Sequence, residues 1–286
     1  MILLTGATGN VGSHLLQILC RDGHPVRALV RSSEKADNLR GYDCETAVGS
    51  FEDPPSLHRA LAGVDRVFLL SRAGEHMAEQ EKAVVDAIAA AHGQARVVKV
   101  AAAGYEHGGI ALAEQHGAVV AHLRASGLPT TVLAPTSFMQ NMLTWAGSIS
   151  ERGQFAAPAG AAAISHVDAR DVAAVAAHVL TSDGHEGASY TVTGAEALTY
   201  AQVAERFTAA LGKPVSYVDV PPEAAREAMV AAGMQSWLAD ALVELNGVYR
   251  TGAAVGTTDE VEKATGRPAR SVETFLQDHL AAFRGM

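Results

Sequence analysis

The feature that most constrains the fold of this chain is a series of glycines directly after its first apolar segment. The run Ile2-Leu3-Leu4 is typical of a buried strand, and Gly6, Gly9 and Gly12 follow it before an apolar helical pattern begins. Glycines in this order permit a tight turn, a close approach of the backbone to a ligand, and close packing of a helix on a strand. The pattern therefore predicts the first βαβ unit of a doubly wound sheet.

Short β-branched runs alternate with longer helical patterns through the first half of the chain, which is the rhythm of a parallel sheet. We predict strands at 1–5, 25–30, 45–48, 65–70, 96–101 and 129–134. We predict helices at 10–22, 34–39, 54–62, 75–92 and 110–126. The expected fold class is α/β, a Rossmann doubly wound parallel sheet.

The rhythm changes after residue 150. A loop rich in Gly, Ala and Pro is expected at 152–163, and return strands that rejoin the sheet are expected from about 164–193. A helix opened by a capping box of Thr199 and Gln202 is predicted next. The last predicted elements are a strand at 215–219 and helices near 222–232, 235–247, 258–264 and 271–283. We therefore divide the chain into a Rossmann domain at 1–150 and a smaller, mostly helical α/β C-terminal domain at 151–286.

Composition and charge argue against several classes of protein. The formal net charge is -9 and the basic residues are scattered, so we expect no nucleic-acid partner. No apolar run reaches the ~20 residues of a membrane-spanning helix, and we expect no signal peptide before the first strand. We expect a cytoplasmic protein without a membrane partner. Neither the two cysteines nor the twelve histidines have metal-ligand spacing, so we expect no metal.

The glycine-rich turn is a candidate dinucleotide site, because the N-terminus of the following helix would face a pyrophosphate. The candidate contacts are Gly6, Thr8, Gly9, Asn10, Val11 and Gly12. The second strand ends in Arg31 and Ser32, with Lys35 just beyond, where an NAD-selective fold usually has an acidic residue. A guanidinium there would hold a 2′-phosphate, so we expect NADP(H) in preference to NAD(H). The alternatives are a plain structural turn and a solvent-exposed arginine.

Several segments spread over nearly the whole chain have a pattern in common with a known family. They are Thr5–Gly12, Val26–Arg31, Ser126–Leu133, Phe138–Asn141, Ile164–Ala173 and Ala264–Pro268. Together they resemble the NmrA-like atypical short-chain dehydrogenases/reductases. The resemblance implies an NADP(H)-binding Rossmann domain with a small substrate domain. It also implies further cofactor contacts from Leu70, Ser71, Arg72, Ala101, Ala102, Pro135, Ser137 and Phe138. Members of this family are either reductases of quinones, aromatic compounds and enones, or redox-sensing regulators.

The catalytic Ser, Tyr and Lys of an ordinary short-chain dehydrogenase are absent from this chain. The fifth strand ends in alanines, and no lysine lies between Lys99 and Lys213. His116 occupies the place where some relatives carry the helix lysine. An imidazole there could contact a ribose hydroxyl or shuttle a proton near neutral pH. The alternative is a histidine on the helix surface.

Two further groups are candidates for substrate contact. Tyr105 and His107 lie in the loop after the fifth strand, at the edge of the sheet where a substrate would lie, and surface cover is their alternative. Phe138, Asn141 and Trp145 follow the sixth strand, where the resemblance places the substrate floor. Packing in the core is the alternative for these three residues.

These observations together favour an NAD(P)H-dependent oxidoreductase acting on a quinone or on a polycyclic aromatic or enone substrate. Hydride reduction of a quinone needs close stacking, one donor to the oxygen and solvent protons, so it tolerates the loss of the usual catalytic set. One alternative is an aromatic-pathway oxygenase-type enzyme on the same fold, and another is a non-catalytic NADP(H)-sensing regulator. The apolar run at 237–245 suits a face for a partner protein, a lid over a substrate, or the seam of a homodimer.

Overall fold

The computed structural model describes residues 1–91 and 94–285, and the chain divides into two units that alternate along the sequence. Unit 1 comprises Met1–Ala134, Ala169–Thr191 and Lys263–Thr265. Unit 2 comprises Pro135–Asp168, Val192–Glu262 and Gly266–Met286. The first boundary thus lies at the end of the sixth strand and not at residue 150. The helix Ala169–Thr181 and all but the last residue of the strand Ser189–Val192 belong to unit 1, whereas 135–150 already belongs to unit 2.

Unit 1 forms, within the described residues, a seven-stranded sheet in the order β3-β2-β1-β4-β5-β6-β9. The strands are β1 (Ile2–Leu4), β2 (Val26–Val30), β3 (Glu45–Val48), β4 (Arg66–Leu69), β5 (Arg96–Val100), β6 (Thr130–Pro135) and β9 (Ser189–Val192). Neighbouring strands from β3 to β6 pair in parallel. β9 runs beside β6, where Val132 N–H donates to the Ala188 carbonyl. The predicted Rossmann sheet is confirmed.

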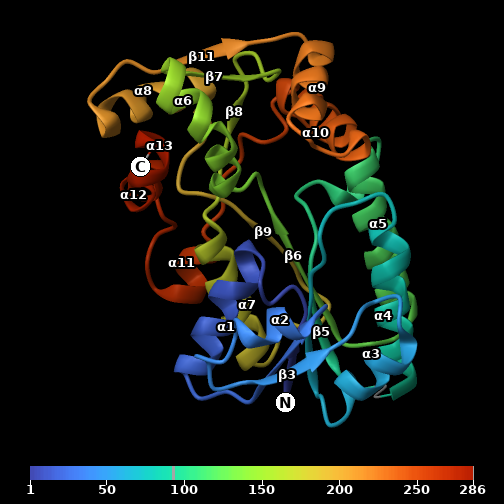
Figure 1. Cartoon of the computed structure of the whole chain (residues 1–286). Coiled ribbons are helices and arrows are strands. Elements are labelled where there is room, and N and C mark those ends of the chain that lie inside the picture. Colours follow the sequence, from blue (N-terminus) through green and yellow to red (C-terminus); the bar gives the residue numbers. More distant parts are fainter. Residues whose placement is uncertain (92–93, 286) are drawn as a thin grey trace. The chain divides into compact units, whose positions relative to one another are not determined.

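Helices cover both faces of this sheet (Figure 1). On one face α1 (Asn10–Arg21) packs against α7 (Ala169–Thr181), and α2 (Ser33–Asp37) follows β2. The other face carries α3 (Pro54–Leu61), α4 (Met77–Ala91) and α5 (Ala111–Ala125), and a short helix η1 (Tyr105–His107) precedes α5. Central-strand residues such as Leu3, Val67 and Val97 are fully buried, as expected for a parallel sheet covered on both sides.

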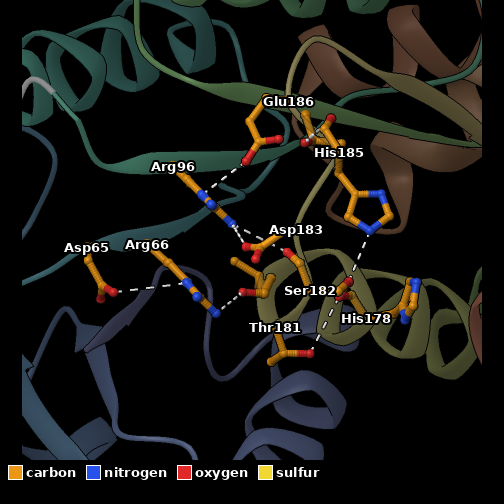
Figure 2. Close-up of polar contacts among 11 residues, drawn as sticks. Asp65, Arg66, Arg96, His178, Thr181, Ser182, Asp183, His185 and Glu186 are labelled. Atoms are coloured by element: carbon orange, nitrogen blue, oxygen red, sulfur yellow. Dashed lines mark hydrogen bonds and ion pairs between the residues drawn. The ribbon is translucent and has the colours of Figure 1, made fainter.

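An ion-pair network closes the amino edge of the sheet (Figure 2). Arg96, at the start of β5, lies 2.5 Å from Asp183 and 3.0 Å from Glu186, measured between nitrogen and oxygen. Arg66, at the start of β4, donates from Nη1 to the Leu180 carbonyl at 2.6 Å. These contacts fix the connection from α7 to β9. The strands end at the opposite, carboxyl edge, where open α/β sheets bind their ligands.

Unit 2 contains two small sheets within its described residues. β7 (Gln154–Ala157) pairs in parallel with β11 (Ser216–Asp219), and β8 (Ala163–Ile164) pairs antiparallel with β10 (Leu198–Thr199). Its helices are η2 (Met139–Trp145), α6 (Ala146–Arg152), α8 (Tyr200–Leu211), α9 (Pro222–Ala231), α10 (Ser236–Arg250), α12 (Val272–Asp278) and α13 (Leu280–Arg284). α11 (Glu260–Thr265) spans the change from unit 2 to unit 1 along the chain. Fully buried Phe155, Phe207 and Phe275 contribute to the core of unit 2.

Two expectations about this half of the chain are wrong, and one is confirmed. The expected loop at 152–163 contains β7. The first of the return strands expected from about 164–193 is the short β8, which pairs with β10 and does not rejoin the main sheet. Only β9 returns. The capping box is present, since Gln202 N–H donates to Thr199 Oγ1 at 3.2 Å and Thr199 N–H donates to Gln202 Oε1 at 2.9 Å.

No helix in the described part of the chain is both long and apolar enough to cross a membrane. Over residues 1–91 and 94–285, no three His, Cys, Asp or Glu side chains gather as metal ligands would.

Candidate dinucleotide-binding and catalytic site

The glycine-rich turn lies at the carboxyl end of β1, where the order of the sheet reverses between β1 and β4. A Cβ atom on Gly12 would stand 2.1 Å from the Gly6 carbonyl oxygen, and one on Gly6 would stand 2.8 Å from the Leu70 carbonyl oxygen. Gly6 also has a φ of 64°, in the left-handed region. Side chains therefore fit at neither position. The turn packs closely against the end of β4, at the switch point where open α/β sheets bind ligands.

The N-terminus of α1 is open toward solvent. Gly9 is the N-cap, and no side chain in the described part of the chain caps this helix. Thr8, Gly9 and Asn10 are exposed, whereas Val11 and Gly12 are buried. The first backbone N–H groups of an uncapped helix are unpaired donors at the positive end of its dipole, which suits a pyrophosphate. The glycine cradle and this helix end therefore fit a dinucleotide.

Exposed cations follow β2 at the same edge of the sheet. Arg31 and Lys35 are both exposed, and neither side chain makes an ion pair with any described residue. The Ser32 hydroxyl oxygen caps α2 by accepting the Lys35 N–H at 3.3 Å, which leaves its own proton free to donate. Two cations without carboxylate partners suit the 2′-phosphate of NADP(H).

A buried polar group lies beneath the loop that follows β4. Leu70 N–H donates to Thr5 Oγ1 at 2.9 Å, which holds the start of the loop on β1. Ser71 donates from both its N–H and its hydroxyl to Glu81 Oε1, at 3.1 and 2.8 Å. The other Glu81 oxygen lies 2.5 Å from Lys99 Nζ, in an ion pair that is not aligned as a hydrogen bond. Both charged side chains are completely buried.

The positions of these charges follow from the fold. Glu81 lies near the start of α4, and Lys99 lies near the end of β5, on the face of the sheet that α4 and α5 cover. Burial lowers the pKa of Lys99, and the Glu81 carboxylate opposes this by favouring the ammonium form. Glu81 and Lys99 were not predicted as a pair from the sequence. The available signal was a lysine within the apolar strand 97–100, since a charge in a strand buried on both faces requires a partner.

His116 faces the same interior layer from α5. Its side chain is buried, with only 7% of the residue exposed, so it is not a surface histidine. Its Nδ1 has no hydrogen-bond partner in the described part of the chain. Burial and the nearby charge of Lys99 hold the pKa of His116 well below its usual value. A neutral imidazole can make a hydrogen bond but is not protonated near neutral pH, which disfavours the proton-shuttle role.

The other two catalytic candidates are placed differently. Tyr105 is buried against β6, and its hydroxyl lies 3.3 Å from Ser189 Oγ and 3.4 Å from Arg124 Nη2. It therefore packs as a core residue of unit 1. His107 is exposed in η1. Among the described residues, no hydrogen bond or ion pair links His116, Tyr105 and His107, so the structure shows no catalytic cluster of these three side chains.

The remaining cofactor candidates of unit 1 lie where strands β4 and β5 end. Leu70 and Ser71 are half-buried and Arg72 is exposed directly after β4. Ala101 is buried and Ala102 half-buried directly after β5. These positions share the carboxyl edge with the glycine-rich turn, because all the strands concerned are parallel.

The candidates in unit 2 differ in exposure. Pro135 is buried, Ser137 and Phe138 are half-buried, and Asn141 is exposed. Val167 N–H donates to the Ser137 carbonyl at 2.9 Å, which connects the segment after β6 to the residues just before α7. Trp145 stacks on Phe155 with ring centroids 4.3 Å apart. Trp145 therefore contributes to the aromatic core, while Asn141 remains accessible to a ligand.

His166 in unit 2 is a buried histidine for which sequence analysis predicted no role. Only 3% of the residue is exposed, and its ring stacks on Tyr200 with centroids 5.6 Å apart. Neither ring nitrogen makes an aligned hydrogen bond with a described residue. Burial lowers the pKa of His166 from 6.5 to about 4, against an opposing effect of the Ser137 backbone.

Replacing His166 by phenylalanine is expected to make the folded state less sensitive to acid. As the pH falls below 6.5, the unfolded chain binds a proton that the folded chain does not bind until about pH 4. Stability is therefore lost over this window, by roughly 2 kcal/mol between pH 7 and pH 5. Urea unfolding at pH 7, 6 and 5 measures this loss, with His58→Gln as a control on the exposed side of α3. Equal acid sensitivity in the wild type and His166→Phe would contradict the assignment.

Known proteins resemble this chain over nearly its whole length. The model of the NmrA-like family matches residues 1–276. The chain is 38% identical over 283 residues to the NAD(P)H azoreductase of Xenophilus azovorans, covering 99% of both chains. It is 37% identical over 285 residues to the (4-alkanoyl-5-oxo-2,5-dihydrofuran-3-yl)methyl phosphate reductase of Streptomyces griseus, covering 99% of both. Its fold matches the NADPH complex of the quinone oxidoreductase QOR2 from Escherichia coli with a TM-score of 0.89 and 28% identity, covering 98% and 99% of the two chains.

Proposed function

This chain belongs to the NmrA-like family, and on that premise we propose that it is an NADP(H)-dependent oxidoreductase that passes hydride to a conjugated, electron-poor acceptor. The observation that carries the proposal is the glycine cradle at the β1/β4 switch point, with the open end of α1 beside it and Arg31 free at the end of β2. The azoreductase and the NADPH-bound quinone oxidoreductase, both similar over nearly the whole chain, support it.

Different residues of unit 1 bind different parts of the cofactor. Gly6, Gly9 and Gly12 give the pyrophosphate access to the backbone donors of α1, and Arg31 with Lys35 neutralises the 2′-phosphate. The bound cofactor supplies the hydride. Ser71 and the alanines after β5 form the rest of the carboxyl edge. His116 lies buried in the layer beneath this edge. Because its imidazole is neutral, it can donate or accept a hydrogen bond without carrying a charge.

The proposed substrates are flat and aromatic, with a quinone as the leading class and an azo compound as the other. Both accept a hydride and then take a proton from water, so neither needs the Ser, Tyr and Lys of an ordinary alcohol dehydrogenase. One NADPH and one proton convert a quinone into a hydroquinone and NADP⁺, which balances without another reactant.

The direct test is anaerobic consumption of NADPH and NADH, followed at 340 nm with a panel of quinones and azo dyes. We expect turnover with NADPH on at least one acceptor class and slower turnover with NADH. The competing function is a sensor that binds the dinucleotide without turnover. It is favoured by the engagement of the Tyr105 hydroxyl with Ser189 and Arg124. Tight NADPH binding with no consumption on any acceptor would support the sensor.

Arg31→Ala is expected to weaken NADPH binding by about 10- to 100-fold, because charge-assisted hydrogen bonds to the 2′-phosphate are lost. NADH binding should change little, because NADH lacks that phosphate. Calorimetry with both cofactors measures the two effects. Arg40→Ala is the matched control, since Arg40 is an exposed cation after α2 that is already paired with Asp37 at 2.7 Å. An equal loss for NADPH and NADH would contradict the assignment of Arg31.

A further inference from the structure

The Ser71 hydroxyl lies at the carboxyl edge of the sheet, between the predicted cofactor site and a buried ion pair. Ser71 follows Leu70, whose carbonyl oxygen is the atom nearest to a Cβ placed on Gly6, so it lies close to the glycine-rich turn. The residue is half-buried. On its inner side both Ser71 donors are bound to Glu81 Oε1, at 3.1 Å from the N–H and 2.8 Å from the hydroxyl.

The polarity of the Ser71 hydroxyl is set by the group beneath it. A hydroxyl has one proton to donate and two lone pairs that accept, and an ionised carboxylate can only accept. Glu81 is held by Lys99 at 2.5 Å, and both side chains are fully buried, so the carboxylate cannot turn away to water. The Ser71 proton is therefore directed at Glu81, and the hydroxyl oxygen can only accept hydrogen bonds on its other side.

The order of the strands indicates which part of a dinucleotide would meet this oxygen. The sheet runs β2-β1-β4, with Arg31 after β2, the glycine-rich turn after β1 and Ser71 after β4. If Arg31 takes the 2′-phosphate of the adenosine half and the turn takes the pyrophosphate, the edge beyond β4 faces the nicotinamide half. The donors in that half are the ribose hydroxyls and the carboxamide N–H groups, whereas phosphate oxygens carry no proton to donate.

We infer that Glu81 and Lys99 are positioning residues that fix Ser71 as a hydrogen-bond acceptor for a donor group in the nicotinamide half of the cofactor. The inference rests on the proposed function, because it requires a bound dinucleotide. Ser71 makes the contact, and the ion pair acts only through Ser71. The donor is either the carboxamide N–H or a ribose hydroxyl, and the same oxygen can serve both.

The test measures binding, with cofactors that lack one donor at a time. NADP⁺, its 3-acetylpyridine analogue, which replaces the carboxamide NH₂ by a methyl group, and its nicotinamide-ribose 2′-deoxy analogue are titrated against the wild type and Ser71→Ala. We expect Ser71→Ala to weaken NADP⁺ binding by about 3- to 10-fold. The analogue that lacks the donor should bind equally well to both proteins, which identifies that donor. Ser71→Thr, which retains a hydroxyl, should restore NADP⁺ binding.

Glu81→Gln tests the positioning role. Lys99 would attract the amide oxygen, so the amide NH₂ would face Ser71, where it would donate to the hydroxyl oxygen and leave the Ser71 N–H without its acceptor. The polarity of Ser71 is then reversed, and we expect NADP⁺ to lose affinity while the 3-acetylpyridine analogue, which offers only a carbonyl oxygen, loses less. If this variant does not fold, the comparison of the wild type with Ser71→Ala still decides the polarity of Ser71.

Ser126→Ala is the matched control. Ser126 is also half-buried, and its hydroxyl donates to the Leu123 carbonyl at 2.7 Å at the end of α5, so its loss should leave all three ligands unaffected. Equal effects of Ser71→Ala on all three ligands, or no effect on any, would overturn the inference and leave the proposed function intact. Failure of the wild type to bind NADP⁺ would overturn both.

Discussion

Replacing Gly12 by alanine is expected to reduce NADPH affinity by about 100-fold, which corresponds to the upper part of the roughly 1–3 kcal/mol that overpacking typically costs. The new Cβ would stand 2.1 Å from the Gly6 carbonyl oxygen and 2.7 Å from its carbonyl carbon. Both neighbours are backbone atoms and cannot swing aside, so the turn must move away from α1. That movement removes the pyrophosphate cradle. Calorimetry gives the affinity, and thermal unfolding monitored by circular dichroism gives the accompanying stability loss.

Two other glycines calibrate this prediction. A Cβ on Gly9 would stand 3.3 Å from the Gly6 oxygen, so Gly9→Ala should weaken binding less than Gly12→Ala. Gly41 has no atom within 4 Å of a Cβ and lies in an exposed loop, so Gly41→Ala should bind NADPH as the wild type does. Near-normal affinity in a folded Gly12→Ala protein would show that the dinucleotide does not use this turn.

Lys99→Met is expected to destabilise the fold by about 3–5 kcal/mol, because it leaves the buried Glu81 carboxylate without its cation. Both side chains are completely inaccessible to water, and within the described residues the carboxylate's other hydrogen bonds come from Ser71 alone. Equilibrium urea unfolding at neutral pH measures the loss. Lys99 and Glu81 lie on β5 and α4, which both contribute to the core of unit 1, so the effect should appear as a lower midpoint of the unfolding transition.

Removing both charges separates the effect of the unpaired charge on stability from the effect of altered packing. The double variant Lys99→Met with Glu81→Leu should recover most of the lost stability, since no unpaired charge remains in the interior. Arg226→Ala is a control for a surface pair. Arg226 and Asp240 are 2.5 Å apart but half exposed, so its loss should cost less than about 1 kcal/mol. A single Lys99→Met variant as stable as the double one would mean that Glu81 and Lys99 do not depend on each other for stability.

Elements with a local signal could be predicted from the sequence. Most strands of unit 1 are apolar or β-branched runs, and a helix follows each of β1 to β5, so their order and approximate bounds follow from the pattern. The capping box at Thr199 and Gln202 is equally local. β7 could not be predicted, because its partner β11 lies far along the chain and the intervening sequence gives no hint of the pairing.

The candidate site could be predicted only in part, for a similar reason. The roles of the glycines and of Arg31 could be predicted because these residues directly follow strands that are recognisable in the sequence. The Glu81–Lys99 pair depends on α4 and β5 being packed together. Glu81 stands among other charged residues such as Lys82, so nothing local marks it as the partner of Lys99. The burial of His116 is likewise decided by tertiary packing, which places it inside the layer formed by α4, α5 and the sheet.

A single-turnover experiment tests the central claim, that the site transfers hydride from NADPH. The protein is loaded under nitrogen with NADPH deuterated in turn at each face of C4 and is mixed in a stopped-flow instrument with a quinone, and separately with an azo dye. We predict oxidation of NADPH together with reduction of the acceptor in a one-to-one ratio, and a slower rate for one of the two deuterated faces. Stable NADPH on the protein, with neither acceptor reduced, would contradict the account and indicate a protein that binds the dinucleotide without using its hydride.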